Sequence, residues 1–260
     1  MKGAFECADK ITTVSPTYAW EILDPWYSHG LDALLRQKQY KLCGILNGID
    51  VDTFNPATDP DIAKNYDAET FQEGKAVCKA ALQDEFGLHK DGSPVMAMVT
   101  RLVGHKGVDL VQAIAEGLLQ QGIELVVLGS GEAQYENFFR DLQNQFPDQV
   151  AAKITFDLGL AARIYAGGDI YLMPSKSEPC GLSQMNAMRY GTVPVVHATG
   201  GLKDTVPPCD ANGEGGLGFT FQSYNADDFY AAIKRALDLY ANNKPAFRAL
   251  QKREMEMDFS

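Results

Sequence analysis

The fold is decided by residues 93–132, which have the sequence SPVMAMVTRLVGHKGVDLVQAIAEGLLQQGIELVVLGSGE. Two short apolar runs, at 95–99 and 123–128, are separated by a segment whose apolar residues recur at helical spacing. Gly122 is placed to end that helix. Continuous apolar strands that alternate with helices are typical of a parallel sheet covered on both faces. The stretch therefore predicts one βαβ unit.

The same alternation continues toward the C-terminus. Further strands are expected at 152–156, 169–173 and 193–196. A helix with one buried face is expected at 228–240, with Asn225 or Ser223 as its cap. The predicted fold class is α/β, with a Rossmann-like parallel sheet flanked by helices.

The first 90 residues follow a different pattern. Strands are expected at 10–14 and 41–46, but the stretch from 55 to 74 is polar and contains two prolines and many acids. Such a composition is typical of a long surface loop. We therefore expect a piece of a second domain in this part of the chain.

Charge and cysteine content exclude several function classes. Among 260 residues, 23 Lys and Arg stand against 34 Asp and Glu, so the net charge is −11. A chain this acidic is not expected to bind nucleic acid or an anionic membrane, and an anionic ligand needs a local basic site.

The five cysteines include no CxxC pair, which favours reduced thiols. No apolar window approaches the ~18 residues of a membrane helix, and we expect a cytoplasmic protein.

The first candidate site follows the strand at 95–99. Arg101 and Lys106 lie between this strand and the next helix. In an open parallel sheet, ligands bind beyond the carboxyl ends of the strands, where helix N-termini offer free amides. Arg can bind two phosphate oxygens and Lys adds a mobile charge, so the pair suits a diphosphate. The alternative is a solvated basic pair on a loop.

A second strand end carries Gly129, Ser130 and Gly131, which resemble the start of a dinucleotide fingerprint. The third glycine of that fingerprint is replaced by Gln134, and no acid follows at the next strand end. Both absences argue against a nicotinamide-dependent dehydrogenase. The glycines are expected to let the backbone approach a neighbouring element or a ligand closely.

A third strand end has the sequence PSKSEPCGLSQM at 174–185. Glu178 could accept hydrogen bonds from sugar hydroxyls, while the amides after Gly181 could point at a phosphate. The alternative is that Glu178 pairs only with Lys176. Cys180 is not expected to act as a nucleophile, because no His and acid accompany it.

Several motifs together carry a resemblance to bacterial glycogen synthase and plant starch synthase. These motifs are GILNGID at 44–50, TRL at 100–102 with KG at 106–107, EPCGL at 178–182, YGT at 190–192, GGL at 200–202 and DT at 204–205. The segment TTVSPTYA at 12–19 also resembles the end of the N-terminal domain of that family. In order and spacing the motifs span most of the chain.

The resemblance implies the C-terminal domain of a GT-B glycosyltransferase, a retaining enzyme that transfers glucose from ADP-glucose to an α-1,4-glucan acceptor. Arg101 and Lys106 would hold the diphosphate, and Glu178 would lie against the donor glucose. Phe156 would lie beside the adenine and Asn47 would touch the sugar. The implied substrate-binding residues are Asn47, Gly129, Ser130, Phe156, Cys180, Gly181, Leu182 and Ser183. No cofactor and no metal are expected, and the DVD sequence at 50–52 is interpreted as part of an interdomain turn.

The chain also departs from the family pattern. Family members have about twice this length, and their KxGGL loop and acceptor-binding residues are absent. We therefore expect a donor-binding half, which lacks the N-terminal domain and transfers little or no glucose alone. Its expected parts are a remnant of the first domain at 1–42, the nucleotide-sugar domain at 43–240 and a helical tail at 241–260.

Two further departures affect the donor contacts. Ser177 replaces an apolar residue before Glu178, and Asn186 stands where other retaining GT-B enzymes have a second Glu. Two alternatives stay open: a non-catalytic nucleotide-binding module, and a retaining GT-B enzyme that uses another nucleotide sugar.

Overall fold

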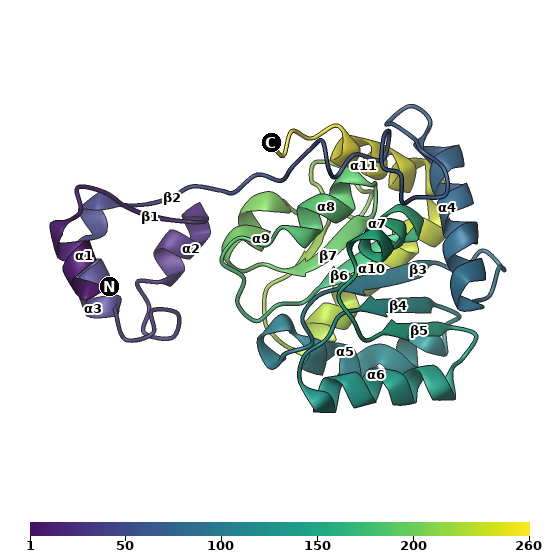
Figure 1. The fold of residues 1–260 in the computed structure, drawn as a ribbon, viewed down its shortest axis with the longest axis horizontal. Coiled ribbons are helices and arrows are strands. Elements are labelled where there is room, and N and C mark those ends of the chain that lie inside the picture. The colour runs from purple at the N-terminus through teal and green to yellow at the C-terminus, as the bar shows by residue number, and fades with distance from the viewer.

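The parallel sheet is present in the computed structural model, which describes residues 1–260 (Figure 1). Its strands are β3 (Val95–Val99), β4 (Glu124–Leu128), β5 (Val150–Lys153), β6 (Ile170–Met173), β7 (Val193–His197) and β8 (Phe219–Phe221). All pair in parallel, in the order β5-β4-β3-β6-β7-β8. The predicted fold class is therefore confirmed.

Helices cover both faces of this sheet. They are α4 (Phe71–Phe86), α5 (Val108–Leu119), α6 (Ala133–Gln145), α7 (Leu158–Gly167), α8 (Ser183–Arg189), α9 (Gly200–Thr205), α10 (Ala226–Asn242) and α11 (Lys244–Met255). Alternate residues of β3 point to opposite cores: Val95 and Ala97 pack with α4, α7 and α8, whereas Met96 and Met98 pack with α5, α6 and α10. Two apolar cores therefore sandwich the sheet, as continuous apolar strands require. None of the helices combines the length and apolar character needed to cross a bilayer.

The helix boundaries follow local capping signals. The predicted helix after β3 is α5, and Gly122 adopts a φ of +79° in the turn beyond it. The side chain of Asn225 accepts a hydrogen bond from the backbone N–H of Asp228, so Asn225 is the cap of α10. The strand expected at 152–156 is β5, which ends earlier, at Lys153.

The prediction of a surface loop at 55–74 is partly wrong. The stretch has no regular structure up to residue 70, but α4 begins at Phe71, and Asp59 and Tyr66 are buried. The Tyr66 hydroxyl donates to the Tyr190 carbonyl at 2.8 Å, and the Tyr190 hydroxyl donates to the Asp59 carboxylate. These buried hydrogen bonds satisfy polar groups that composition alone assigns to solvent.

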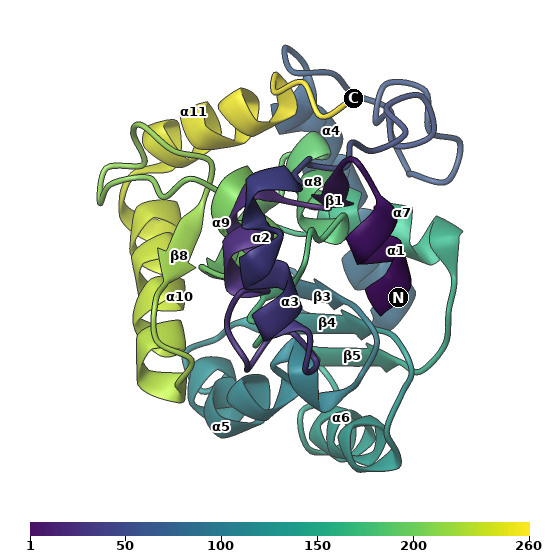
Figure 2. The same ribbon diagram turned by 90° about the vertical axis from the view of Figure 1, so that its left-hand side faces the viewer.

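Residues 1–44 form a small lobe that an extended segment joins to the larger domain (Figures 1 and 2). The lobe consists of α1 (Lys2–Cys7), β1 (Ile11–Thr13), α2 (Pro16–Glu21), α3 (Asp32–Gln37), a 3-10 turn (Gln39–Lys41) and β2 (Leu42–Gly44). β1 and β2 pair in parallel, with Ile11 opposite Leu42. Both expected N-terminal strands are therefore present, and α2 lies against α9.

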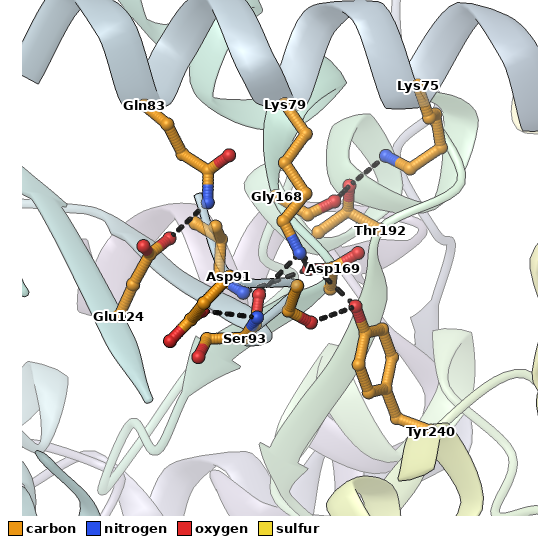
Figure 3. Close-up of polar contacts among 12 residues, drawn as sticks. Lys75, Lys79, Gln83, Asp91, Ser93, Glu124, Gly168, Asp169, Thr192 and Tyr240 are labelled. Atoms are coloured by element: carbon orange, nitrogen blue, oxygen red, sulfur yellow. Dashed lines mark hydrogen bonds and ion pairs between the residues drawn. The ribbon is translucent and has the colours of Figure 1, made fainter. Parts of the chain in front are cut away.

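A buried carboxylate lies at the amino end of β4. Glu124 is fully buried, and one of its oxygens accepts a hydrogen bond from Gln83 of α4 at 2.7 Å, while the other has no partner (Figure 3). Burial raises the pKa of Glu124 from 4.5 to about 7, because a charged carboxylate loses its hydration there. The folded protein thus binds more protons than the unfolded chain between these two pH values.

This pKa shift makes stability depend on pH. The stabilising contribution is complete below pH 4.5 and is lost as the pH rises through 7, where the folded state must hold an ionised Glu124. We expect Glu124→Gln to raise the free energy of unfolding by roughly 1–3 kcal/mol at pH 8 and by much less at pH 5. Urea denaturation at both pH values measures this. Glu116→Gln, at an exposed position of α5, is the control. A gain of equal size at pH 5 and pH 8 contradicts the interpretation.

Candidate donor-binding site

The candidate residues gather where the strand order reverses. β3 and β6 are neighbours, with Met96 opposite Ile170 and Ala97 opposite Tyr171. The chain continues from β3 to β4 on one side and from β6 to β7 on the other. The loops after β3 and β6 therefore diverge and leave a crevice at the carboxyl ends of the strands. Arg101 follows β3, and Glu178 lies in the loop after β6.

Glu178 and Lys106 form an ion pair across this crevice. Lys106 ends a 3-10 turn (Gly104–Lys106), and its ammonium lies 2.5 Å from Oε2 of Glu178. The Ser175 hydroxyl donates to the same oxygen at 3.0 Å. Both charged side chains are largely buried, with exposed fractions of 15% and 10%. Two donors therefore fix the carboxylate in one position, as a site that must orient a ligand requires.

The alternative pairing of Glu178 with Lys176 is wrong. The Lys176 ammonium lies 4.9 Å from the ring centre of Trp26 and 5.6 Å from that of Tyr224, a cation–π arrangement. The backbone N–H of Lys176 donates to the carbonyl of His105 at 2.9 Å. This bond ties the loop after β6 to the loop after β3.

The small lobe holds the Glu178 loop from the other side. The Ser15 hydroxyl donates to the Pro179 carbonyl at 2.6 Å. The Glu21 carboxylate accepts from the Thr199 hydroxyl at 2.9 Å and from the Gly200 N–H at 2.8 Å. The residue after Glu178 is therefore fixed by a side chain from the start of the chain.

A cleft of about 290 Å³ opens at the same carboxyl end of the sheet, and its lining includes neither Lys106 nor Glu178. Its lining residues are Phe54, Val99, Thr100, Arg101, Leu128, Gly129, Ser130, Thr155, Phe156, Asp157, Leu158, Ala161, Tyr165, Leu182, Ser183 and Asn186. Half of them are hydrophobic. Small-molecule sites typically combine such apolar walls with a few convergent polar groups.

Six of the residues predicted from sequence line this cleft: Arg101, Gly129, Ser130, Phe156, Leu182 and Ser183. Arg101 is exposed and forms no ion pair with another residue. Phe156 is 82% exposed at the cleft wall, so one face of its ring is free. The backbone N–H groups of Leu182 and Ser183 have no backbone acceptor. A cation, an aromatic face and free amides thus meet in one cleft.

The other five predicted residues lie outside the cleft lining: Lys106 and Glu178, which form the ion pair, and Asn47, Cys180 and Gly181. Cys180 is buried, and burial raises the pKa of its thiol, although a hydrogen bond from the backbone of Asn47 partly opposes this. A neutral thiol fits the expectation that Cys180 is not a nucleophile. Gly181 adopts a φ of +74°, and a Cβ there would lie 2.6 Å from the amide oxygen of Gln184. The backbone hydrogen bond to Cys180 places Asn47 against the loop that carries Glu178.

The glycines after β4 let two loops pack against each other. A Cβ on Gly129 would lie 1.7 Å from the Thr100 carbonyl oxygen, and one on Gly131 would lie 2.2 Å from the Leu102 carbonyl oxygen. The predicted close approach is thus to the backbone of the loop after β3. Only glycine permits this approach, which brings Ser130 beside Arg101 in the cleft lining.

The local charges at the site also affect His105. Burial lowers the pKa of His105, and the nearby charges of Lys106 and Arg101 lower it further. The imidazole is therefore neutral at pH 7.

The carboxylate of Asp50 accepts hydrogen bonds from the backbone and side chain of Thr53, which lower its pKa. No group of three or more His, Cys, Asp or Glu is arranged to hold a metal ion.

Sequence reasoning did not select several cleft residues. Phe54, Thr155 and Tyr165 line the cleft, yet none belongs to a motif at a strand end. Tyr165 lies on α7 within an apolar helical pattern that is equally consistent with core packing. Phe54 comes from the irregular stretch before α4. Tertiary structure is needed to bring such residues to the site.

A parallel sheet flanked by helices, with a cleft at its switch point, is the architecture of a Rossmann-like domain of the GT-B glycosyltransferase fold. Residues 81–252 match the family model described as Glycosyl transferases group 1, and the chain belongs to that family. Residues 1–37 match a second model, described as the starch synthase catalytic domain.

Individual relatives agree with the family resemblance seen in the motifs. The chain is 48% identical over its full length to the glycogen synthases of Exiguobacterium sibiricum and Clostridium perfringens. It spans about half the length of these relatives, 54% in both cases. The resemblance to glycogen synthase is therefore confirmed.

Solved structures share the fold. The catalytic domain of starch synthase IV from Arabidopsis thaliana, bound to ADP and acarbose, aligns with a TM-score of 0.93 at 38% identity. The alignment covers 100% of this chain and 54% of that one. Anabaena HepE in complex with UDP and glucose aligns with a TM-score of 0.65 at 15% identity, over 97% of this chain and 58% of that one. The second likeness concerns the fold alone.

The scaffold of the site can be tested at Gly107, which follows Lys106. Gly107 has a φ of +77°, and a Cβ there would lie 2.1 Å from the Pro174 carbonyl oxygen. We expect Gly107→Ala to lower the free energy of unfolding by about 2 kcal/mol or more, through strain and the clash. Gly117→Ala is the control, because nothing lies within 4 Å of a Cβ there and α5 would gain about 0.5–1 kcal/mol. Urea denaturation compares the two. Equal effects of the two substitutions would refute the assigned role.

Proposed function

We propose that this chain is the donor-binding part of an ADP-glucose-dependent glucosyltransferase that extends α-1,4-glucan with retention at the anomeric carbon. The observation that carries the proposal is the fixed Glu178–Lys106 ion pair, which lies at the same carboxyl end of the sheet as the cleft lined by the unpaired Arg101. The chain that carries this ion pair is 48% identical over its full length to glycogen synthase. The ADP and acarbose bound to starch synthase IV support a nucleotide donor and a glucan acceptor.

Donor binding would use the free groups of the cleft. The Arg101 guanidinium can bind two phosphate oxygens at once, and the N–H groups of Leu182 and Ser183 are available to the distal phosphate. Phe156 offers an exposed ring on which an adenine can stack. The free amides and the guanidinium together explain how an acidic chain can hold an anionic ligand.

Glucose transfer would use the ion pair. As the bond between glucose and diphosphate breaks, negative charge grows on the departing ADP, and Lys106 and Arg101 are placed to stabilise it. Glu178 cannot move freely, because Lys106 and Ser175 both hold Oε2. Its other oxygen, Oε1, is then left to accept a hydrogen bond from a hydroxyl of the donor glucose. Fixed partners of this kind need no reorganisation when the charge develops.

The acceptor glucan needs a second domain. GT-B enzymes close their site between two Rossmann-like domains, and this chain spans about half the length of its relatives. We propose that residues 1–42 belong to the N-terminal domain, 43–240 form the donor domain and 241–260 begin the C-terminal helical tail. The match of residues 1–37 to the starch synthase catalytic domain supports this division.

Nucleotide choice provides the first test. We expect calorimetric titration to give saturable binding of ADP, weaker binding of UDP, and at least about a tenfold loss of ADP affinity in Arg101→Ala, which lacks the bidentate phosphate contact. Arg140→Ala, on the exposed face of α6, is the matched control. Equal binding of UDP would favour another nucleotide sugar, and an unchanged affinity in Arg101→Ala would contradict the assigned phosphate contact.

The role of Glu178 is tested in a full-length enzyme that carries this chain. We expect Glu178→Ala to lower kcat by about two orders of magnitude or more and to change ADP affinity little, because the carboxylate acts on the glucose. Incorporation of glucose into glycogen measures kcat, and Glu116→Gln is the exposed control. The isolated chain sets the baseline, since a site closed by two domains cannot form from one. Unchanged turnover in Glu178→Ala rules out this role.

A further inference from the structure

A second pocket lies at the opposite end of the sheet from the donor cleft. It has a volume of about 180 Å³ and opens between α4, α10 and α11, beside the amino ends of β3 and β6. Four of its lining residues are cationic: Lys75, Lys79, Lys244 and Arg248. Asp169 is the only acid in the lining. The pocket therefore has an excess of positive charge in a chain whose net charge is −11.

The two lysines of α4 are fixed by hydrogen bonds (Figure 3). Lys75 is buried and donates to the carbonyls of Ala166 and Tyr190, both at 3.0 Å, and to the Thr192 hydroxyl at 2.9 Å. Lys79 forms an ion pair with Asp169 at 2.6 Å. The single acid of the pocket is thus already neutralised, and the charge of Lys75 has no carboxylate in hydrogen-bond contact.

The two cations of α11 have no carboxylate partner, although the Lys244 ammonium lies 5.9 Å from the ring centre of Tyr240. Lys244 and Arg248 are one helical turn apart, both are exposed, and neither forms an ion pair or a side-chain hydrogen bond. The first turn of α11 contains no acid, although the positive end of a helix dipole favours one. The positive end of the helix repels Lys244, the first residue of α11, and Arg248 one turn further on repels it as well, so an anionic ligand would relieve that repulsion.

Three aromatic residues also contribute to the wall, alongside Gln72, Ala76, Gly167 and Gln251. Phe71, Tyr240 and Phe247 line the pocket, and the rings of Tyr240 and Phe247 pack edge to face at 5.2 Å. Drug-sized ligands occupy pockets of about 300–1,000 Å³, so this pocket suits a smaller molecule. Its ligand would carry an anionic group for α11 and a compact body for the aromatic wall.

We propose that this pocket binds a small phosphomonoester. Lys244 and Arg248 together match the two negative charges of the phosphate, and Arg248 can bind two of its oxygens. Lys75, which has no carboxylate in hydrogen-bond contact, leaves positive charge at the floor of the pocket, whereas Lys79 and Asp169 neutralise each other. The aromatic residues offer contacts for a small organic body. The site lies away from the donor cleft and does not depend on the proposed transferase activity.

The test uses glycerol 3-phosphate as the probe and glycerol as its uncharged match. Two-dimensional amide NMR of the whole chain should show saturable shifts at the start of α11 and in α4 with glycerol 3-phosphate and none with glycerol. Replacing both α11 cations, Lys244→Gln with Arg248→Gln, should weaken binding at least about tenfold. Lys234→Gln, an exposed lysine of α10 outside the pocket, should leave it unchanged.

A second arm separates this pocket from the donor cleft. In Arg101→Ala, which removes the phosphate contact of the cleft, the shifts at α11 should persist with the same affinity. Shifts confined to the loop around Arg101, shifts that do not saturate, or an affinity unaffected by the double substitution in α11 would each overturn the proposal. All the substituted side chains of α11 are exposed, so loss of folding is not expected to obscure the result.

Discussion

The parallel pairing of β3 with β6 is the constraint on which the rest of the structure depends. It joins the two halves of the sheet at the point where successive strands are added in opposite directions. The Tyr171 hydroxyl reinforces the junction by donating to the Val99 carbonyl at 2.8 Å, at the end of β3. Every group of the candidate donor site is displayed from loops that begin near this junction or from elements packed on them.

A balance of charge governs the site. The buried Glu178 is tolerated because Lys106 and Ser175 satisfy it, since an unpaired carboxylate at this depth would be costly. Lys106 in turn is held in place by Glu178, while Arg101 forms no ion pair. At the amino ends of the strands, Lys79 and Asp169 also form an ion pair. The cations of α11 in the same pocket have no carboxylate partner.

Sequence patterns predicted the sheet well because buried parallel strands are continuous apolar runs. They failed where polar composition conceals burial: the stretch around Tyr66 is rich in acids, yet it packs through hydrogen bonds to Tyr190. β8 has only three residues, and so short an apolar run was not predicted as a strand. For the site, position after a strand predicted Arg101 and Glu178 as candidates, and both lie in loops at the carboxyl end of the sheet. The choice of Lys106 over Lys176 as the partner of Glu178 depends on how two loops meet, which no local pattern contains.

The hydrogen bond from Ser15 to Pro179 joins residues that are 164 positions apart. A contact of such separation carries a larger loop-closure entropy than contacts between neighbouring elements. The loop of Glu178 thus owes one of its restraints to a segment that contributes no strand to the six-stranded sheet. Loss of order in the small lobe would release this restraint without breaking any strand pairing of that sheet.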